Sequence, residues 1–250
     1  MRICLAQVRS ETGAVDRNVS RHLAVLGQLA PGAADLVVFP ELSLSNYDPE
    51  VAGPSAVRPD DDRLAPLQRF ADETGTAVAV GAPLRSDDPT GAPEKPRIAL
   101  LVFGPGRRPV VVAKTHLHAD EAPYFSPSGA GPSVLDLPVP VGVAICYEVT
   151  VAAHADALVE AGAAVYLASV AKTPAGVAAA RATLAETARR HGVPALMVNS
   201  VGTCEGERAG GGSLVIDREG RLVHQLGASD ERLLVYDTES GTATVLRIGP

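Results

Sequence analysis

The fold of this chain is constrained most strongly by an alternation of two kinds of segment. Short, continuous apolar runs alternate with segments in which apolar residues recur at the spacing of a helix. The apolar segments lie at residues 2–8, 35–40, 76–82, 97–104, 109–115, 141–146, 164–170 and 194–202. Continuous rather than alternating apolar runs are typical of strands that are buried on both faces. The segments of helical spacing lie at residues 16–30, 61–75, 151–163 and 174–192. This alternation predicts an α/β protein in which helices cover the sheets.

The ends of several predicted elements carry signals of their own. Pro174 falls in the first turn of the last predicted helix, and Gly192 follows its basic final turn, as helix start and stop rules require. Residues 210–227 predict a β-hairpin that turns at "DREG", and residues 232–240 predict a further strand. The C-terminal third is therefore expected to be mainly β.

The Pro- and Asp-rich segments 48–63 and 86–96 predict long surface loops rather than domain boundaries. The chain contains no internal repeat and no long Pro/Ser linker. We therefore expect one domain that spans residues 1–250.

Composition excludes several classes of function. Charged residues make up 20% of the chain and the formal net charge is −7, so we expect no nucleic-acid partner. No apolar run reaches the length of about 18 residues that spans a membrane, and the N-terminus lacks a secretory signal pattern. Three cysteines far apart, without a CxxC pair, favour free thiols over a disulfide framework or a structural zinc site. We expect a cytoplasmic protein with no membrane association.

Three predicted strands end in a residue that can do chemistry. Glu41 follows "VVFP", Lys114 follows "VVVA", and Cys146 follows "VGVAI". Taken singly, a glutamate or a lysine is more often a surface residue, and a strand cysteine is more often part of the core. In an open α/β sheet, however, strand ends bring side chains from distant parts of the chain to one crevice. A carboxylate, an amine and a thiol at three strand ends therefore predict a catalytic site.

The segments around these residues resemble the motifs of the nitrilase superfamily of carbon–nitrogen hydrolases. "FPELSLSNY" resembles its glutamate motif, "KTHLHADEAPYFSPSG" its lysine motif and "GVAICYE" its cysteine motif, in the family's order. The resemblance implies that Cys146 is the nucleophile, Glu41 the general base and acid, Lys114 the stabiliser of the oxyanion, and Glu121 a second glutamate beside the lysine. It also implies a four-layer αββα sandwich and a homodimer that pairs through helices including residues 177–190. We expect no cofactor.

The chemistry of these residues supports the same roles. A free thiol is only a few per cent thiolate at neutral pH, so a nucleophilic cysteine needs a base or a nearby cation. Attack on an amide carbonyl creates an oxyanion, which the Lys114 ammonium and the backbone N–H of Tyr147 can stabilise. Glu41 can return the proton to the leaving nitrogen and then activate water. We therefore expect hydrolysis of a small linear amide through a thioester, with release of ammonia or an amine. An omega-amidase, an aliphatic amidase and an N-carbamoyl hydrolase all fit these residues, and so does a nitrile substrate.

The rest of the substrate pocket differs from the family's usual pattern. After Cys146 the chain departs from the family's usual pattern: Glu148 stands in the acidic position, and the arginine and proline that often follow are missing. These departures leave the substrate open. We expect five substrate-binding residues: Tyr47, Tyr124, Tyr147, Lys172 and Asn199.

Several alternatives remain open at this stage. His116, His118, Asp120 and Glu121 are compatible with a hydrolase metal site, but that hypothesis leaves Lys114 and Cys146 without roles, and we expect no metal. The chain can also be an acyltransferase that passes its acyl group to an amine, or a non-catalytic binding protein of the same fold. The other two cysteines serve as internal comparisons, because Cys4 is expected in the core and Cys204 in a polar loop without a role.

Overall fold

The computed structural model describes residues 1–85 and 95–249. The strands are β1 (Arg2–Gln7), β2 (Leu36–Val38), β3 (Ala77–Leu84), β4 (Arg97–Phe103), β5 (Val110–Ala113), β6 (Ser133–Leu135), β7 (Val141–Ile145), β8 (Val165–Val170), β9 (Ala195–Asn199), β10 (Thr203–Cys204), β11 (Glu207–Arg208), β12 (Leu214–Ile216), β13 (Leu222–Gln225), β14 (Arg232–Asp237) and β15 (Thr242–Arg247). The α-helices are α1 (Val15–Leu26), α2 (Ala52–Ser55), α3 (Ala65–Thr74), α4 (Ala152–Glu160) and α5 (Pro174–His191). Short 3₁₀ helices are η1 (Pro49–Val51), η2 (Asp62–Leu64), η3 (Ala119–Glu121) and η4 (Cys146–Thr150).

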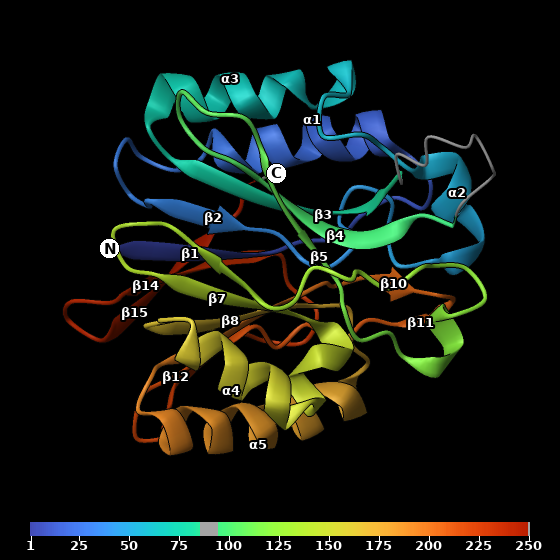
Figure 1. Cartoon of the computed structure of the whole chain (residues 1–250). Helices are drawn as coiled ribbons and strands as arrows, with labels where there is room; N and C mark the ends of the chain where they lie inside the picture. The colour runs from blue at the N-terminus through green and yellow to red at the C-terminus, as the bar shows by residue number, and fades with distance from the viewer. Residues whose placement is uncertain (86–94, 250) are drawn as a thin grey trace.

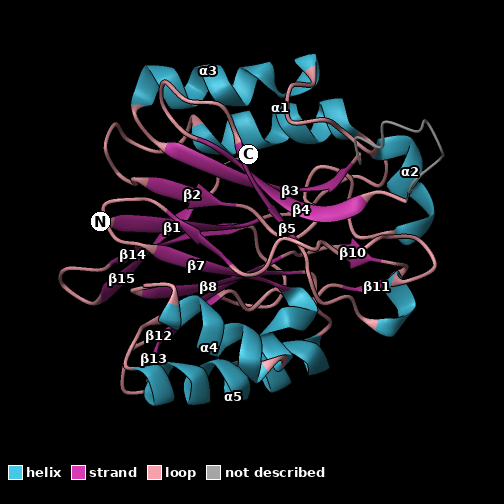
Figure 2. Ribbon diagram, in the orientation of Figure 1, coloured by secondary structure: helices cyan, strands magenta, loops and turns pink. Residues whose placement is uncertain are grey.

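Two mixed sheets stack face to face between two layers of helices. One sheet has seven strands in the order β15-β14-β1-β2-β3-β4-β5, and the other has six in the order β13-β12-β9-β8-β7-β6. Helices α1 and α3 lie outside the first sheet, and α4 and α5 lie outside the second (Figures 1 and 2). The predicted four-layer αββα sandwich is therefore confirmed.

The continuous apolar runs follow from this layering, because each central strand contributes to two cores. Ile3 and Leu5 of β1 pack in the core between the two sheets, whereas Cys4 and Ala6 pack in the core beneath α1 and α3. Strand β8 likewise divides its side chains between the inter-sheet core and the core beneath α4 and α5. Cys4 is completely buried, as the sequence predicted.

The helix ends follow the predicted signals closely. Helix α5 begins at Pro174, and Thr173 caps it by accepting a hydrogen bond from the backbone N–H of Gly176. Gly192 ends the helix in the left-handed conformation with φ of +67°, which a glycine adopts without strain. The predicted hairpin consists of β12 and β13, and its turn includes Asp217 and Gly220.

The first of the two predicted surface loops contains short helices. Residues 48–63 were expected to form a long loop, but they contain η1, α2 and the start of η2. The reason is local, because Asp48 and Asp61 each cap a following turn by accepting a backbone N–H, and Pro49 suits the first helical position. Residues 86–94 of the second predicted loop lie outside the described residues.

Strand direction brings the predicted catalytic residues to one end of the sandwich. Strand β2 runs parallel to β3, and β4 is antiparallel to both β3 and β5, so β2 and β5 run in the same direction. Their carboxyl ends, followed by Glu41 and Lys114, consequently lie at the same edge of the seven-stranded sheet. The hairpin formed by β10 and β11 lies at this end of the molecule (Figure 1). Among the helices described, none has both the length and the apolar character needed to cross a membrane.

Candidate active site

Three buried charged residues meet at the end of the sandwich. The Lys114 ammonium lies 2.8 Å from Glu41 Oε1 and 2.6 Å from Glu121 Oε1. The side chains of Lys114 and Glu41 have no exposed surface, and that of Glu121 has 1%. A charge this deeply buried is stable only when it is paired, and here one cation pairs with two carboxylates. The structure thus brings together two residues from strand ends and a third that only the family resemblance had suggested.

A tight turn over strand β3 holds Glu41 in place. Leu42, the next residue, has φ of +52°, a conformation that costs energy for any residue except glycine. Gly81 of β3 allows the turn to pass closely, because a Cβ there would lie 2.3 Å from the backbone nitrogen of Leu42. Ser169 of β8 adds a link from the other sheet by donating a hydrogen bond to the Phe39 carbonyl at 3.0 Å.

Cys146 stands on a sharp elbow directly after β7. Its φ of +47° is strained for a residue with a Cβ, and such strain is commonly found at functional sites. The thiol is partly exposed and donates a hydrogen bond of 3.8 Å to the Ala171 carbonyl just beyond β8. It lines a cavity of about 310 Å³ that also includes Glu121. The nucleophile predicted from the sequence therefore faces a space that a small molecule can enter.

The charges around the thiol favour its protonated form at rest. Burial and the negative charge of Glu41 raise the pKa of Cys146 to about 11, although Lys114 and Lys172 act in the opposite direction. Burial also raises the pKa of Glu41 despite the charge of Lys114, and Glu121 contributes to the rise. Burial alone would lower the pKa of Lys114, but the charges of Glu41, Cys146 and Glu121 outweigh it and raise that pKa. The thiol therefore needs a base, and Lys114 stays a cation.

Glu121 accepts hydrogen bonds from two residues that line the cavity. Its Oε1 also accepts a hydrogen bond of 2.9 Å from the Tyr47 hydroxyl, and its Oε2 accepts one of 2.7 Å from the backbone N–H of His118. Burial, followed by the charges of Glu41 and Glu121, raises the pKa of Tyr47, so this hydroxyl remains a donor. Glu121 is thus positioned to hold Lys114.

The five predicted pocket residues fall into two groups. Tyr47, Tyr147 and Lys172 line the cavity beside Cys146. Tyr124 is exposed and does not line it. Asn199 is completely buried and also lies outside the lining; its side chain hydrogen-bonds both the N–H and the carbonyl of Lys172. Asn199 therefore supports the loop that carries Lys172 and does not face the substrate space.

The hairpin formed by β10 and β11 supplies lining residues that the sequence did not indicate. Cys204, expected to be incidental, is buried and lines the cavity together with Glu205 and Glu207. Glu205 stands at φ of +51° and donates its backbone N–H to the Tyr47 carbonyl at 2.8 Å. The polar segment "GTCEGERAGG" has no periodicity that predicts this placement, which depends on contacts far apart in the chain.

The histidine-rich stretch after Lys114 does not assemble a metal site in the described part of the chain. Glu121 binds Lys114, while His118 Nδ1 lies 3.3 Å from Asp120 Oδ2. The His116 ring packs edge-on against His154, with ring centroids 5.6 Å apart. No three histidine, cysteine, aspartate or glutamate side chains among the described residues are grouped so as to hold a metal ion.

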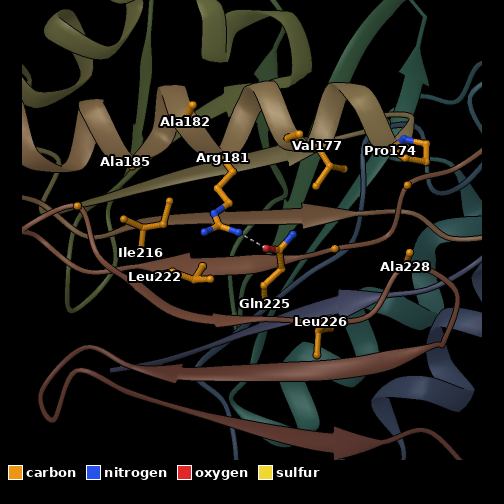
Figure 3. Close-up of a pocket in the computed structure, with 14 residues that line it drawn as sticks. Pro174, Val177, Arg181, Ala182, Ala185, Ile216, Leu222, Gln225, Leu226 and Ala228 are labelled. Carbon is orange, nitrogen blue, oxygen red and sulfur yellow. Dashed lines mark hydrogen bonds between the residues drawn. The ribbon is translucent and has the colours of Figure 1, made fainter.

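A second groove of about 500 Å³ runs between α5 and the β12–β13 hairpin. Arg181 crosses it and donates a hydrogen bond of 3.1 Å to Gln225 (Figure 3). Apart from this pair, the labelled lining is mostly aliphatic, and it includes no cysteine, histidine or carboxylate. This groove therefore lacks the groups that covalent or acid–base catalysis requires.

The chain is similar to known proteins along nearly its whole length. The sequence profile of the family described as carbon-nitrogen hydrolase matches residues 2–247. A glutamine-dependent NAD(+) synthetase from Rhodobacter capsulatus is 30% identical over 97% of this chain, which spans only 44% of that protein. An (R)-stereoselective amidase from Pseudomonas sp. is 28% identical over 94% of this chain and 84% of its own length.

Solved structures share the fold. An amidase from Nesterenkonia sp. AN1 superposes with a TM-score of 0.83, covering 95% of this chain and 92% of that one at 23% identity. A CN-hydrolase superfamily protein from Xanthomonas campestris also has a TM-score of 0.83, at 20% identity, with coverage of 96% and 91%. Both have the same layered architecture as this chain.

Proposed function

The chain belongs to the carbon-nitrogen hydrolase family, and from that premise we propose that it hydrolyses small linear amides through a thioester on Cys146. One observation carries this proposal. A buried lysine is held between two buried glutamates at the cavity that the Cys146 thiol enters. Nucleophile, base and cation are thus available within one site, as amide hydrolysis by covalent catalysis requires.

The first half-reaction forms the thioester. Cys146 Sγ attacks the carbonyl carbon while Glu41 takes the thiol proton, and the carbonyl oxygen becomes an oxyanion. The Lys114 ammonium and the backbone N–H of Tyr147 stabilise that oxyanion. Glu41 then returns the proton to the nitrogen as the C–N bond breaks, so ammonia or an amine leaves and the acyl group stays on sulfur.

The second half-reaction releases the acid. Water attacks the thioester carbonyl while Glu41 takes one of its protons, and the same donors stabilise the second oxyanion. Collapse breaks the C–S bond, the carboxylic acid leaves, and the proton returns to Cys146. Removing an oxyanion donor typically costs about 10²- to 10³-fold in kcat, so Lys114 is expected to matter in both halves.

The size of the cavity and the character of the relatives support an amide substrate. A volume of about 310 Å³ lies at the small end of ligand pockets, which favours a short substrate. The Pseudomonas relative is named as an amidase, and a mutant of the Nesterenkonia amidase has been solved after Michael addition of acrylamide at its active-site cysteine. The chain spans less than half of the NAD(+) synthetases it matches, so their overall reaction is not proposed for it.

A panel of compounds tests this function directly. Purified protein is incubated with aliphatic amides, N-carbamoyl compounds and nitriles, and ammonia release is measured together with intact mass. We expect turnover of short amides and an acyl adduct on Cys146. Cys146→Ala should be folded and inactive, whereas Cys204→Ala, which removes the other cavity thiol, should retain turnover. Turnover by Cys146→Ala would contradict the mechanism.

The same assay distinguishes the alternatives. With hydroxylamine present, an acyltransferase gives hydroxamate in preference to acid, whereas a hydrolase gives mainly acid. A binding protein that keeps only the fold gives neither product, and its Cys146 is not acylated by any compound in the panel.

Two wider expectations are also proposals. The three cysteines are free thiols, which supports a cytoplasmic location because thiols stay reduced there; fractionation of the producing cells tests it. The homodimer implied by the family resemblance stays a prediction, and sedimentation analysis of the purified protein tests it.

A further inference from the structure

Glu148, which the mechanism above does not use, is a buried carboxylate with contacts to both sheets. It lies in η4, two residues after Cys146, and only 2% of its surface is exposed. Its Oε1 accepts hydrogen bonds from the backbone N–H groups of Thr115 at 2.6 Å and His116 at 3.1 Å. Its Oε2 accepts one from the backbone N–H of Ile145 at 2.8 Å. A carboxylate that accepts three N–H bonds forms strong, charge-assisted contacts.

The partners of Glu148 adjoin two catalytic residues. Thr115 directly follows Lys114 at the end of β5 in the seven-stranded sheet, and Ile145 directly precedes Cys146 at the end of β7 in the six-stranded sheet. One side chain therefore connects the chain positions next to the nucleophile and next to the ammonium. We propose that Glu148 is a positioning residue that sets the separation of the Cys146 thiol and the Lys114 ammonium by holding both strand ends.

A purely local role does not account for all these contacts. Glu148 Oε2 accepts a hydrogen bond from the backbone N–H of Ile145, three residues earlier in the chain. This bond is one half of a capping interaction that stabilises η4. The bonds from Thr115 and His116 cross more than thirty residues of sequence to the other sheet. They contribute nothing to the cap, but they fix the backbone on which Lys114 stands.

This geometry matters to the reaction because both residues must reach the same carbonyl group. A misplacement of about 1 Å in a catalytic group can cost about 10²-fold in rate. The proposal rests on the function proposed above, since it assigns Glu148 to positioning within that site. It adds a residue that does not touch the substrate but controls how two that do are arranged.

Glu148→Gln keeps the shape of the side chain but leaves one carbonyl oxygen to serve both sets of donors. The amide NH₂ then faces a backbone N–H, so one strand end is released. We expect kcat to fall by about 10²-fold, while KM changes by less than about threefold because the cavity lining is unchanged. Glu148→Asp keeps both oxygens on a stem one methylene shorter, and its kcat should lie between wild type and Gln.

A matched control separates positioning from loss of stability. Thr76 is buried and donates a hydrogen bond of 3.0 Å to the Ala34 carbonyl, ahead of β3 and β2 and thus at the opposite edge of the sheet. Thr76→Val should lower the melting temperature with kcat unchanged. If folded Glu148→Gln keeps wild-type kcat and only melts earlier, as the control does, the proposal is wrong. If the Gln variant does not fold, a folded Asp variant with wild-type kcat overturns it equally.

Alkylation of Cys146 provides a readout that does not depend on the substrate. Iodoacetamide modification at fixed pH, followed by peptide mass, reports on the thiol in wild type and variants alike. Moving the ammonium away should slow this modification in Glu148→Gln by at least about threefold, and an unchanged or faster rate contradicts the proposal. A wild type that turns over no amide would instead refute the proposed function, while the alkylation comparison still decides the role of Glu148.

Discussion

Replacing Lys114 by Met should make stability depend strongly on pH. The ammonium is the partner of two carboxylates whose side chains are 0% and 1% exposed. Breaking a buried pair by removing one partner costs about 3–5 kcal/mol, because the remaining charge is left uncompensated. The variant can escape part of that cost by protonating Glu41, whose pKa burial already raises, and protonation becomes easier as the pH falls.

The size of the effect follows from the proton that must be taken up. An unfolded glutamate has a pKa of about 4.3, and each pH unit above it adds about 1.36 kcal/mol to the cost of keeping one carboxyl protonated. That cost is about 3.7 kcal/mol at pH 7 and about 1 kcal/mol at pH 5. Burial already raises the pKa of Glu41 in the wild type, and losing Lys114 raises it further. A carboxyl whose folded-state pKa is raised stabilises at low pH and loses that contribution as pH rises.

Urea unfolding, followed by circular dichroism at pH 5, 6, 7 and 8, gives the difference in free energy of unfolding between Lys114→Met and wild type. We expect the difference in free energy of unfolding to narrow by about 2.7 kcal/mol from pH 7 to pH 5 for a proton that Glu41 takes up in the folded variant but not in the folded wild type, while the variant stays inactive throughout. Lys95→Met is the control, because that ammonium is exposed and donates a hydrogen bond to the Ala122 carbonyl, so its loss should shift the free energy of unfolding by less than about 0.5 kcal/mol. A difference that is the same at pH 5 and pH 7 would refute the idea that Lys114 compensates the two carboxylates.

Three further predictions concern the residues around Lys114. The rate of alkylation of Cys146 should increase about tenfold per pH unit from pH 7 to 9, because the pKa of the thiol is raised to about 11. A rate that reaches a plateau near pH 8 would contradict this. Gly81→Ala should lower the melting temperature and kcat/KM together, because its Cβ would meet backbone at 2.3 Å, whereas Gly53→Ala has nothing within 4 Å and should change neither. Tyr47→Phe removes a hydrogen bond to Glu121 and should cost about 1.5–3 kcal/mol in urea unfolding; an unchanged midpoint would show that this bond contributes nothing.

The layered fold could be predicted because strands buried on both faces have continuous apolar sequences. Strand β8 reads as a continuous apolar run since Leu167 faces the inter-sheet core and Ala168 faces α5 and its neighbours. Strands without a continuous apolar run were not predicted. β15 (Thr242–Arg247) is an edge strand whose residues are exposed or half-buried, and β6 (Ser133–Leu135) has only three residues. Neither segment is long and apolar enough to indicate a strand before its neighbours are known.

The residues of the site also differ in whether a local sequence pattern predicts them. Glu41, Lys114 and Cys146 were predicted because each directly follows an apolar run, and parallel strands bring such ends together. The position of Cys204 at the cavity was not predicted, because it depends on long-range contacts such as the 3.1 Å hydrogen bond from Asn46 Nδ2 to the Thr203 carbonyl. Contacts between residues so far apart in the chain leave no local pattern, so only the folded structure reveals them.

The electrostatics of the resting site favour Glu41 as the base in the proposed mechanism. A thiol with a pKa of about 11 is only about 0.01% thiolate at pH 7, so its proton must leave as the C–S bond forms. Lys114 cannot accept it, because its pKa is raised. Glu41 Oε2 can, since it is buried and has no other hydrogen-bond partner among the described residues. Transfer neutralises Glu41 just as the carbonyl oxygen becomes negative, so the net charge of the buried site is unchanged. The Lys114 ammonium, still held by Glu121, then compensates the oxyanion in place of Glu41, and no additional charge has to be created in a medium of low dielectric constant.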